Sequence, residues 1–314
     1  MSNTVQNISS IDNSPGPAIS DEVGLPLGNT KDKHIRKVPA AGTRISVSTY
    51  SLSRALGATY HDTPASERVR TRRETYGMGS VSLLELPARL AAAGIHTFEI
   101  SHPHLPQRET SYLNELRAAI TEAGVHLLSV LIEDGDITHA DNAARDLKWM
   151  EGWIATAGEL GAERARVIAG KAACMPQTLQ QSLQHMKELA RHGTEHNVRV
   201  TTENWFDLLA APAAVYFLLD SLEGTVGFNL DFGNWGGPTK YDDLAVIFPY
   251  AESCHAKCDF IVPYEPNSSD FRHCLDLAKT ASFAGPYTMI YNDTGDNEWR
   301  GLEIEREMIL PYLS

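Results

Sequence analysis

The sequence is short of positive charge. Its 27 lysines and arginines stand against 40 aspartates and glutamates, which gives the 314 residues a formal net charge of −13. A protein of this charge repels a nucleic-acid backbone instead of releasing its counterions. We therefore expect no nucleic-acid partner.

Long apolar runs and cysteines are also scarce. No stretch approaches the roughly 20 apolar residues of a membrane span, and residues 1–20 lack the basic start and apolar centre of a secretory signal. The four cysteines, at positions 174, 254, 258 and 274, are too few and too irregular for a disulfide framework or a zinc finger. These absences predict a cytoplasmic protein with reduced thiols and no membrane partner.

Three common catalytic motifs are missing as well. The sequence contains no G-x-x-x-x-G-K-[ST], no H-E-x-x-H and no G-x-S-x-G. It therefore lacks the signatures of P-loop nucleotide hydrolases, zincin proteases and serine hydrolases.

The chain divides into a short arm and one large domain. Residues 1–42 are rich in Ser, Asn, Pro and Gly without an apolar period, which predicts a flexible arm. Residues 43–314 then come close to the roughly 250 residues of an eight-fold β/α barrel. We expect the arm to be followed by a single domain.

Short apolar or β-branched runs alternate with longer amphipathic stretches along this domain, as in βα units of a parallel sheet. Eight runs are found, at residues 44–50, 96–101, 125–132, 164–169, 198–203, 226–231, 251–257 and 287–291. Four glycines, Gly94, Gly124, Gly161 and Gly193, are expected to end helices in the left-handed conformation. Eight uninterrupted units favour an α/β fold of the (β/α)8 TIM barrel type over an open doubly wound sheet.

Three successive strands finish with residues that bind metals. Glu203 ends the fifth run, Asp231 ends the sixth and His255 lies in the seventh. Because the carboxyl ends of barrel strands carry the active site, these side chains are expected to converge. Two carboxylates and one imidazole suit Mn²⁺ first, with Mg²⁺, Co²⁺ and Zn²⁺ as alternatives, and leave coordination positions for substrate.

Other residues at the same rim are candidates for catalysis. His104 and Lys171 follow the second and fourth runs, and Lys257 shares a strand face with His255. A histidine can transfer protons near neutral pH, and a lysine can stabilise negative charge or donate a proton. Each also has a structural alternative, as a solvated loop residue or an internal ion-pair partner.

Several rim residues are candidates for binding substrate. These are Tyr50, His102, Glu133, Trp205 and Trp235, although packing or turn formation explains each of them equally well. The long loop at residues 53–79 carries Arg68, Arg70, Arg72 and Arg73, and it could form a lid that grips a phosphate or carboxylate of the substrate. A solvated helix face or a subunit contact is the more common role of such a cluster.

The residues of four segments identify a family resemblance. Thr202-Glu203-Asn204, Leu230-Asp231-Phe-Gly-Asn234, His255-Ala-Lys257 and Gly285 to Ile290 resemble the xylose-isomerase-like TIM barrels over residues 45–313. That family includes ketose 3-epimerases, hydroxypyruvate isomerase, inosose dehydratase and endonuclease IV. The resemblance implies a carbohydrate substrate, a homo-oligomer, and a metal held by Glu203, Asp231, His255 and a second glutamate from the eighth strand.

The second glutamate is absent. The matching stretch reads Met289-Ile290-Tyr291-Asn292-Asp293. We expect Asn292 or Asp293 to supply the fourth oxygen, unless three side chains and water hold the metal. Tyr291 is the remaining candidate there, as an acid or a substrate contact.

The resemblance implies a divalent-metal sugar isomerase or epimerase that abstracts an α-proton through an enediolate, with Glu203 as the base. The missing glutamate weakens a two-base epimerisation. The alternatives are a lyase or dehydratase on a 3-oxo sugar or glycoside, including C-glycoside cleavage, and a non-catalytic barrel subunit. An endonuclease-IV-like phosphodiesterase is disfavoured by the net charge and the few strand-end histidines.

Overall fold

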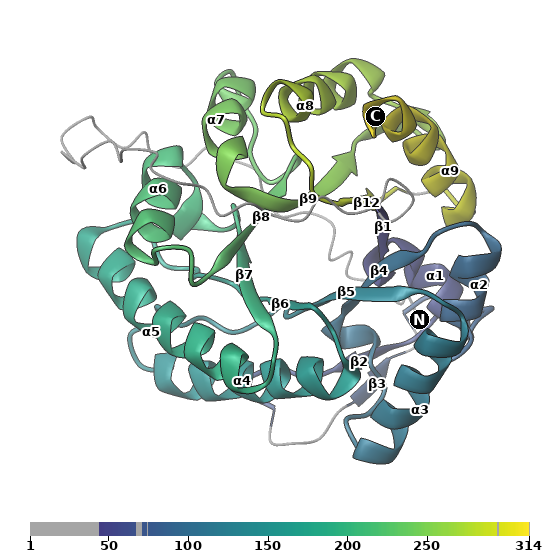
Figure 1. Ribbon diagram of the computed structural model, residues 1–314, viewed down its shortest axis with the longest axis horizontal. Helices are drawn as coiled ribbons and strands as arrows, with labels where there is room; N and C mark the ends of the chain where they lie inside the picture. The colour runs from purple at the N-terminus through teal and green to yellow at the C-terminus, as the bar shows by residue number, and fades with distance from the viewer. Residues whose placement is uncertain (1–43, 67–70, 74, 294, 314) are drawn as a thin grey trace, which may run out of the picture.

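Eight parallel strands close into a barrel that is surrounded by helices (Figure 1). The computed structural model describes residues 44–66, 71–73, 75–293 and 295–313. The barrel strands are β1 (Ile45–Ser48), β4 (Thr97–Ser101), β5 (His126–Leu131), β6 (Arg164–Arg166), β7 (Arg199–Glu203), β8 (Gly227–Asp231), β9 (Ala251–Cys258) and β12 (Tyr287–Tyr291). Every predicted run coincides with one of these strands to within a few residues, so the TIM barrel is confirmed. The predicted arm lies outside the described residues.

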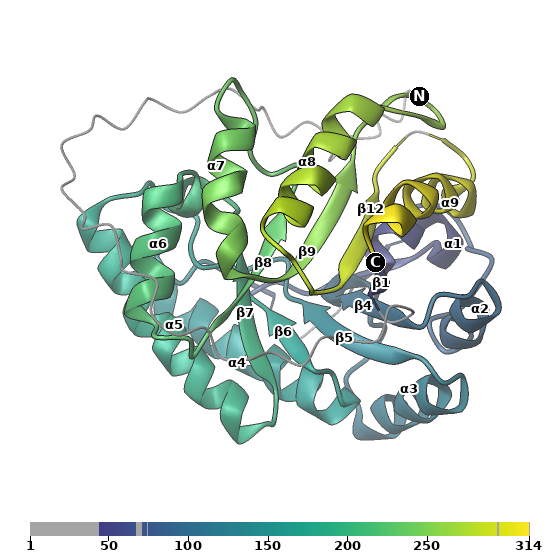
Figure 2. The ribbon, with the colours of Figure 1, turned by 45° about the horizontal axis from the view of Figure 1, so that its top comes forward.

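The strands follow one another around the ring in sequence order, and β12 pairs with β1 to close it. The outer layer consists of α2 (Leu86–Ala92), α3 (Thr110–Glu122), α4 (Ala143–Leu160), α5 (Pro176–Glu195), α6 (Pro212–Ser221), α7 (Lys240–Ile247), α8 (Ser268–Thr280) and α9 (Glu298–Ile309). Figure 2 shows these helices running alongside the strands. None of the helices in the described ranges is both long enough and apolar enough to cross a membrane.

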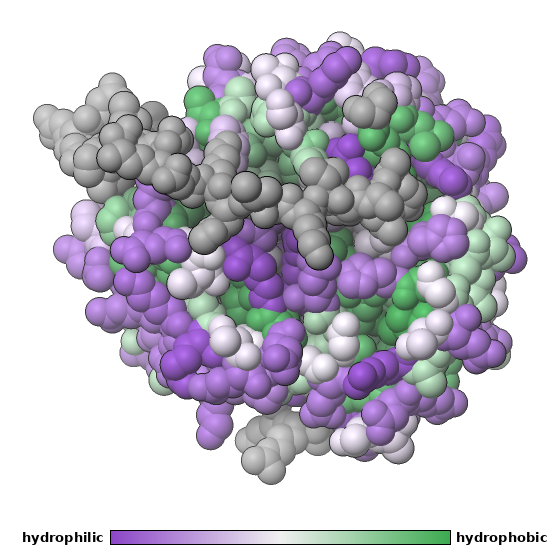
Figure 3. Space-filling view, in the orientation of Figure 1, coloured by the Kyte–Doolittle hydropathy of each residue, from purple (hydrophilic) through white to green (hydrophobic). Residues whose placement is uncertain are grey.

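Apolar side chains fill the space between strands and helices. Val47 and Phe98 from the strands, and Leu90, Trp153 and Leu218 from the helices, are fully buried there. In the space-filling view, hydrophilic residues dominate the outer rim of the molecule (Figure 3). The burial of apolar side chains between the strands and the helices is therefore the main source of the stability of the barrel.

The inner face of the barrel is polar. Because side chains alternate across a strand, one residue in two points inward. The inward set includes Ser46, Ser48, Thr97, Glu99, Ser129, Arg166, Thr201, Glu203, Asn229, Asp231, Ser253, His255 and Thr288, all buried. A TIM barrel usually fills this space with Val, Ile and Leu. Here the interior is built largely from groups that form hydrogen bonds.

Glycines end several helices as predicted, with one exception. Gly94, Gly124 and Gly161 adopt positive φ after their helices, at 71°, 64° and 76°. The prediction for Gly193 is wrong, because α5 continues through it to Glu195 and Asn197 takes the left-handed conformation at φ 59°. A Cβ on Gly193 would lie 2.7 Å from the Val198 carbonyl oxygen, so this glycine allows α5 to approach β7.

The long segment after β1 folds into a helix and a hairpin. The segment contains α1 (Ser53–Leu56) and the antiparallel pair β2 (Thr59–His61) and β3 (Thr71–Arg73). Arg72 and Arg73 are exposed in β3, whereas Arg68 and Arg70 lie outside the described residues. A second small hairpin, β10 (Phe260–Val262) with β11 (Glu265–Pro266), follows β9.

Candidate metal centre and active site

Glu203, Asp231 and His255 meet at the inner rim of the barrel. Glu203 and Asp231 are the last residues of β7 and β8, and Asp231 is in register with His255 of β9. One ligand atom from each of the three lies within 4.8 Å of the other two, and all three side chains are buried. The predicted convergence of these residues is therefore present in the fold.

His255 is oriented by a carboxylate that the sequence analysis did not single out. Its Nε2 lies 2.9 Å from Oε2 of Glu99, on β4. Its Nδ1 lies 3.1 Å from Oε2 of Glu203 and 3.6 Å from Oδ2 of Asp231. Burial alone would lower the pKa of His255, but the carboxylates of Glu203 and Glu99 outweigh burial and raise that pKa well above its usual value. Because Nε2 is engaged by Glu99, Nδ1 of the imidazole faces Glu203 and Asp231.

Glu203 is held on both oxygens. Asn229 Nδ2 donates to Oε2 at 3.0 Å, and Asn234 Nδ2 donates to Oε1 at 2.7 Å. Nε of the buried Arg166 lies 3.4 Å from Oε2. Burial would raise the pKa of Glu203, but the charges of His255 and Arg166 hold it well below its usual value. The carboxylate is thus ionised and fixed in orientation.

The turn after β8 fixes Asp231. Its Oδ1 accepts hydrogen bonds from the backbone amides of Gly233 and Asn234, at 2.6 and 2.9 Å. Asn204 holds the Asp231 backbone, accepting from its amide at 2.8 Å and donating to its carbonyl at 3.0 Å. Because Oδ1 is engaged by the turn, Oδ2 is the oxygen that faces His255.

These three residues fit a divalent cation. Glu203 Oε2, Asp231 Oδ2 and His255 Nδ1 form a mixed oxygen and nitrogen donor set, as Mn²⁺ and Mg²⁺ accept. The contact between Glu99 and His255 Nε2 is the carboxylate support that metal-bound histidines usually have. A cation can take the place of the proton on Nδ1, because a histidine must be neutral to bind a metal.

Ile290 occupies the inward position of β12 beside this centre. Thr288 of β12 is in register with His255, and Ile290 is in register with Lys257. Ile290 is therefore the inward residue of β12 next to the site, and it is apolar and buried. Asn292 is exposed beyond the end of β12 and remains only a predicted ligand.

Tyr291, predicted as an acid or a substrate contact, lies on the outer side of the barrel wall. A Cβ on Gly301 of α9 would come within 2.2 Å of its ring, so the ring packs directly on that helix. Its hydroxyl lies 3.4 Å from Asp293 Oδ2, and Phe260 meets its ring edge to face. The alternation of β12 that turns Ile290 inward turns Tyr291 outward.

The two predicted histidines after β4 are buried in hydrogen-bond networks. His102 Nδ1 accepts from the backbone amide of Glu133 at 3.0 Å, and Nε2 lies 3.0 Å from the Asp62 carbonyl oxygen. His104 Nδ1 lies 3.0 Å from the Thr49 hydroxyl, and burial lowers its pKa to about 4. His102 thereby connects the segment after β2 to the end of β5, and His104 connects the ends of β1 and β4.

Lys257 and Tyr50 lie beside the three converging residues. The aliphatic chain of Lys257 covers Gly233, where an added Cβ would lie 2.7 Å from its Cδ. The charge of Asp231 raises the pKa of Lys257, so the ammonium stays protonated. Tyr50 directly follows β1 at the mouth of the barrel and is 44% exposed, and burial of its hydroxyl raises its pKa.

The other predicted residues lie further from the centre. Lys171 forms an ion pair with Asp134 at 2.7 Å on the rim. Trp205 is half-buried, and the guanidinium of Arg166 lies 5.1 Å from the centroid of its ring. Trp235 is buried in the core and donates to the Leu209 carbonyl at 3.0 Å, so it supports the loop instead of forming an open wall.

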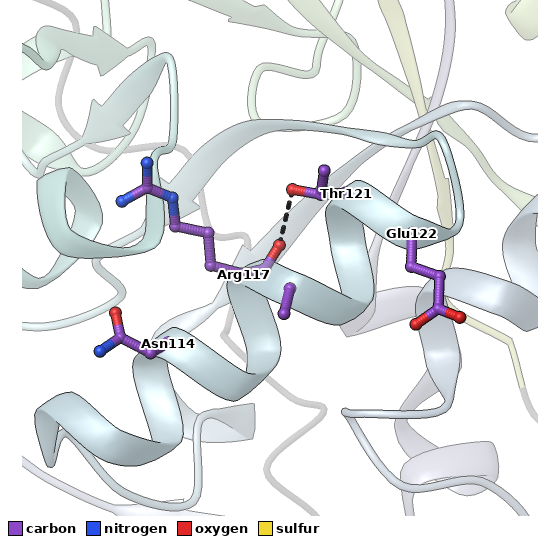
Figure 4. A pocket seen from close by; sticks show the side chains of 5 residues that line it. Asn114, Arg117, Thr121 and Glu122 are labelled. Atoms are coloured by element: carbon purple, nitrogen blue, oxygen red, sulfur yellow. Dashed lines mark hydrogen bonds between the residues drawn. The ribbon is translucent and has the colours of Figure 1, made fainter.

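A surface hollow elsewhere on the molecule does not compete with this site. It is lined by Asn114, Arg117, Ala118, Thr121 and Glu122. Figure 4 shows that these residues come from one helix, α3, with Thr121 donating to the Arg117 carbonyl. A hollow with a single wall cannot enclose a ligand, unlike typical small-molecule pockets.

Comparisons with known proteins identify the fold and the family. The family model described as xylose isomerase-like TIM barrel matches residues 87–298. No curated protein matches the chain. Among solved structures, a xylose isomerase-like TIM barrel protein from Mycobacterium smegmatis in complex with magnesium has 16% identity and a TM-score of 0.62, covering 88% of this chain and 98% of that one.

Two further structures carry functional names. An L-ribulose 3-epimerase has 15% identity and a TM-score of 0.61, with 86% of this chain and 94% of that chain covered. The probable 3-DHS dehydratase AsbF from Bacillus anthracis has 14% identity and a TM-score of 0.59, with 85% and 98% covered. At these identities the solved structures establish the fold alone. The family match over residues 87–298 goes further, and the chain belongs to the xylose isomerase-like TIM barrel family.

Proposed function

We propose that the protein is a divalent-metal-dependent enzyme that isomerises a carbohydrate by abstracting a proton beside a carbonyl group. The observation that carries this proposal is the convergence of Glu203, Asp231 and His255, with His255 turned by Glu99 so that Nδ1 faces both carboxylates. Three side-chain donors leave coordination positions for two substrate oxygens. Relatives named as an epimerase and as a magnesium complex support the same reading.

Glu203, Asp231 and His255 would hold the cation, and a bound cation would supply Lewis-acid polarisation of the carbonyl. Glu203 is the base. Asn229 and Asn234 hold one oxygen each, and a carboxylate oxygen has a second lone pair with which to accept the substrate proton. This fixed orientation provides the proximity that general-base catalysis requires.

Lys257 is the proton donor in this proposal. It follows His255 by two residues on the same face of β9, and its chain runs over Gly233 beside Asp231. An ammonium at this position stabilises the negative charge of the enediolate and returns a proton to it. Tyr50, at the mouth, covers the substrate from the side of β1.

Solvent exchange tests the proposal before the physiological sugar is known. A panel of ketoses, 2-hydroxy aldehydes and 3-oxo glycosides is incubated in D₂O with the Mn²⁺-loaded protein, and NMR detects exchange of the α-proton. We expect exchange with at least one sugar, its loss on chelation, and a loss of about 10²- to 10⁴-fold in Glu203→Gln. The surface variant Glu122→Gln serves as the control. Exchange that survives both chelation and Glu203→Gln contradicts the proposal.

A second candidate is elimination from an oxidised sugar or glycoside, and Ile290 favours it. An apolar side chain at the inward position of β12 removes the second carboxylate that a two-base epimerisation uses. Elimination needs only one base for the α-proton and an acid for the leaving group. Mass spectrometry separates the two reactions, because an isomer keeps the mass of the substrate and an elimination product does not.

A further inference from the structure

Arg166 joins the base to a second carboxylate. Its Nη2 donates to Oε2 of Glu133 at 2.8 Å, and its Nε lies 3.4 Å from Oε2 of Glu203. The guanidinium is almost fully enclosed, with 4% of the side chain exposed. The carboxylates of Glu133 and Glu203 raise the pKa of Arg166 in spite of its burial, so the charge is permanent. Glu133 is thus bound rigidly to the same cation that lies beside the base.

Glu133 is the most exposed of the three residues Glu133, Arg166 and Glu203. Its side chain is 21% exposed, whereas those of Arg166 and Glu203 are 4% and 5% exposed. Ser101 Oγ donates to Oε1 at 3.1 Å, and the backbone amide of Glu133 is held by His102 Nδ1 at 3.0 Å. A carboxylate has about four lone-pair sites, and these contacts use two of them. Two acceptor sites in a fixed orientation therefore remain for a ligand.

The charges around Glu133 define the class of ligand. Asp134 follows it directly and already neutralises Lys171, at 2.7 Å. Arg166 is shared with Glu203 and is enclosed. A phosphate or carboxylate placed here would meet the negative charge of Glu133, whereas a hydroxyl group would donate a hydrogen bond to it.

We propose that Glu133 binds hydroxyl groups of the substrate, and that Arg166 and Ser101 position it for this role. The ligand at this end of the site is an uncharged polyhydroxyl segment, and the site rejects a sugar that carries a phosphate there. This inference rests on the proposed function, because the sugar must reach Glu203 and Glu133 at once. Arg166 acts through the two carboxylates and is a positioning residue.

A double-mutant cycle between protein and ligand tests this assignment. The sugar with the fastest exchange is compared with its deoxy analogues and its phosphate ester, by calorimetric titration of the Mn²⁺-loaded protein. For the wild type, we expect one deoxy analogue to bind about 10- to 100-fold more weakly, the range for hydrogen bonds to a charged group. The parent sugar should bind Glu133→Gln more weakly than it binds the wild type, by a similar factor. In Glu133→Gln, the deoxy analogue should bind less than about 3-fold more weakly than the parent sugar.

Two further variants keep the test decisive. Ser101→Ala removes one support of Glu133 and should weaken the parent sugar in the same direction by a smaller factor, even if Glu133→Gln does not fold. Glu122→Gln, an exposed carboxylate on α3, should bind like the wild type. Additive losses in the cycle, unchanged binding in both Glu133→Gln and Ser101→Ala, or tighter binding of the phosphate ester would overturn the inference.

Failure of this inference is distinguishable from failure of the proposed function. If α-proton exchange depends on Glu203 and on metal but the cycle is additive, only the role of Glu133 is lost. If no sugar in the panel exchanges its α-proton or binds, both proposals are lost together.

Discussion

The inside of the barrel and the layer between barrel and helices are built on different principles. The outer layer contains apolar side chains such as Phe98, Trp153 and Leu218, whose burial stabilises the fold. The inside contains serines, threonines and ionisable groups such as Glu99, Arg166 and His255, and its order depends on hydrogen bonds and ion pairs. The stability of the protein comes mainly from the first region and its chemistry from the second.

One buried carboxylate of the outer layer, Glu305, differs from the carboxylates inside the barrel. Inside the barrel, Glu99, Glu133 and Glu203 each contact a cation or an imidazole. In the outer layer, Glu305 of α9 is completely buried, and neither of its carboxyl oxygens forms a hydrogen bond within the described chain. A buried carboxylate without a partner is costly. The carboxylates inside the barrel therefore differ from Glu305 in that each has a partner. The predictions below test that contrast.

Removing the central cation of the interior should have the largest effect on stability. Arg166→Met leaves the buried Glu203 and the partly exposed Glu133 beside an apolar chain, and breaking the buried pair with Glu203 costs about 3 to 5 kcal/mol of unfolding free energy. Urea denaturation measures the loss. The control is Arg191→Met, which breaks an exposed i,i+4 pair with Glu195 and should cost less than about 0.5 kcal/mol. Equal losses of unfolding free energy in Arg166→Met and Arg191→Met would contradict the claim that the buried ion pairs matter more for stability than the exposed ones.

Changing the support of His255 should weaken metal binding more than it weakens folding. Glu99→Gln removes the carboxylate at 2.9 Å from Nε2, and loss of such support typically lowers metal affinity by about 10- to 100-fold. Calorimetric titration with Mn²⁺ gives the affinity. The matched control is Ser129→Ala, on the neighbouring strand and in register with Glu99. An unchanged affinity in Glu99→Gln would show that Glu99 does not orient the metal ligand.

Neutralising Glu305 should stabilise the protein. Burial raises the pKa of Glu305 well above its usual value, and the nearby backbone of Cys258 offsets this only in part. Because the folded pKa of Glu305 exceeds the unfolded one, the free energy of unfolding is highest below about pH 4.5, where the carboxyl is protonated in both states. It falls as the pH rises toward the folded pKa. Glu305→Gln cannot ionise, so it should be more stable than the wild type at pH 8, where the unfolded carboxyl is ionised and the buried one resists ionisation.

Denaturation at pH 5 and pH 8 checks this prediction. The wild type should lose more stability than Glu305→Gln between the two values. Parallel pH dependences in the two proteins would mean that Glu305 has a partner in solution. Glu303, an exposed carboxylate on the same helix, provides the control variant Glu303→Gln.

The smallest effect is expected at the surface. The pKa of Glu163 is lowered to about 2, first by the hydrogen bond from His126 and then by the charge of Arg164, which outweigh burial. The stability from this group is present above pH 4.5 and is lost as the pH falls toward 2. Since the Glu163 side chain is 46% exposed, solvent screening limits the cost of Glu163→Gln to less than about 1 kcal/mol. A loss of 2 kcal/mol or more at pH 7 would contradict this limit.

The sequence predicts the barrel well because its signals are local. The eight runs and the glycines at 94, 124 and 161 specify strands and helix ends without any long-range contact. Gly193 shows the limit of that reasoning, since its role depends on the approach of Val198 and Val200 from another element. The strand-end pattern likewise predicts the convergence of Glu203, Asp231 and His255.

The supporting residues could not be predicted in the same way. Glu99 and Arg166 lie within strands, where facing inward depends on register, and β5 has a shift opposite Phe98 and Glu99 that no sequence pattern announces. For Glu99 the available signal was a single charge within an otherwise uncharged strand, whereas β6 reads Arg164-Ala165-Arg166 and offers no such contrast. Tyr291 illustrates the same difficulty, because a displacement of one residue along β12 decides between the inner site and the contact with Gly301.

Metal binding tests the central claim most directly. Purified protein is stripped with chelator and titrated with Mn²⁺ in a calorimeter, alongside Asp231→Asn. We predict one ion per chain for the wild type, and for Asp231→Asn a loss of affinity at least as large as the roughly 10- to 100-fold typical of a supporting residue. Absence of binding to the wild type, or equal binding by the variant, would contradict the assignment of Glu203, Asp231 and His255 as the metal centre.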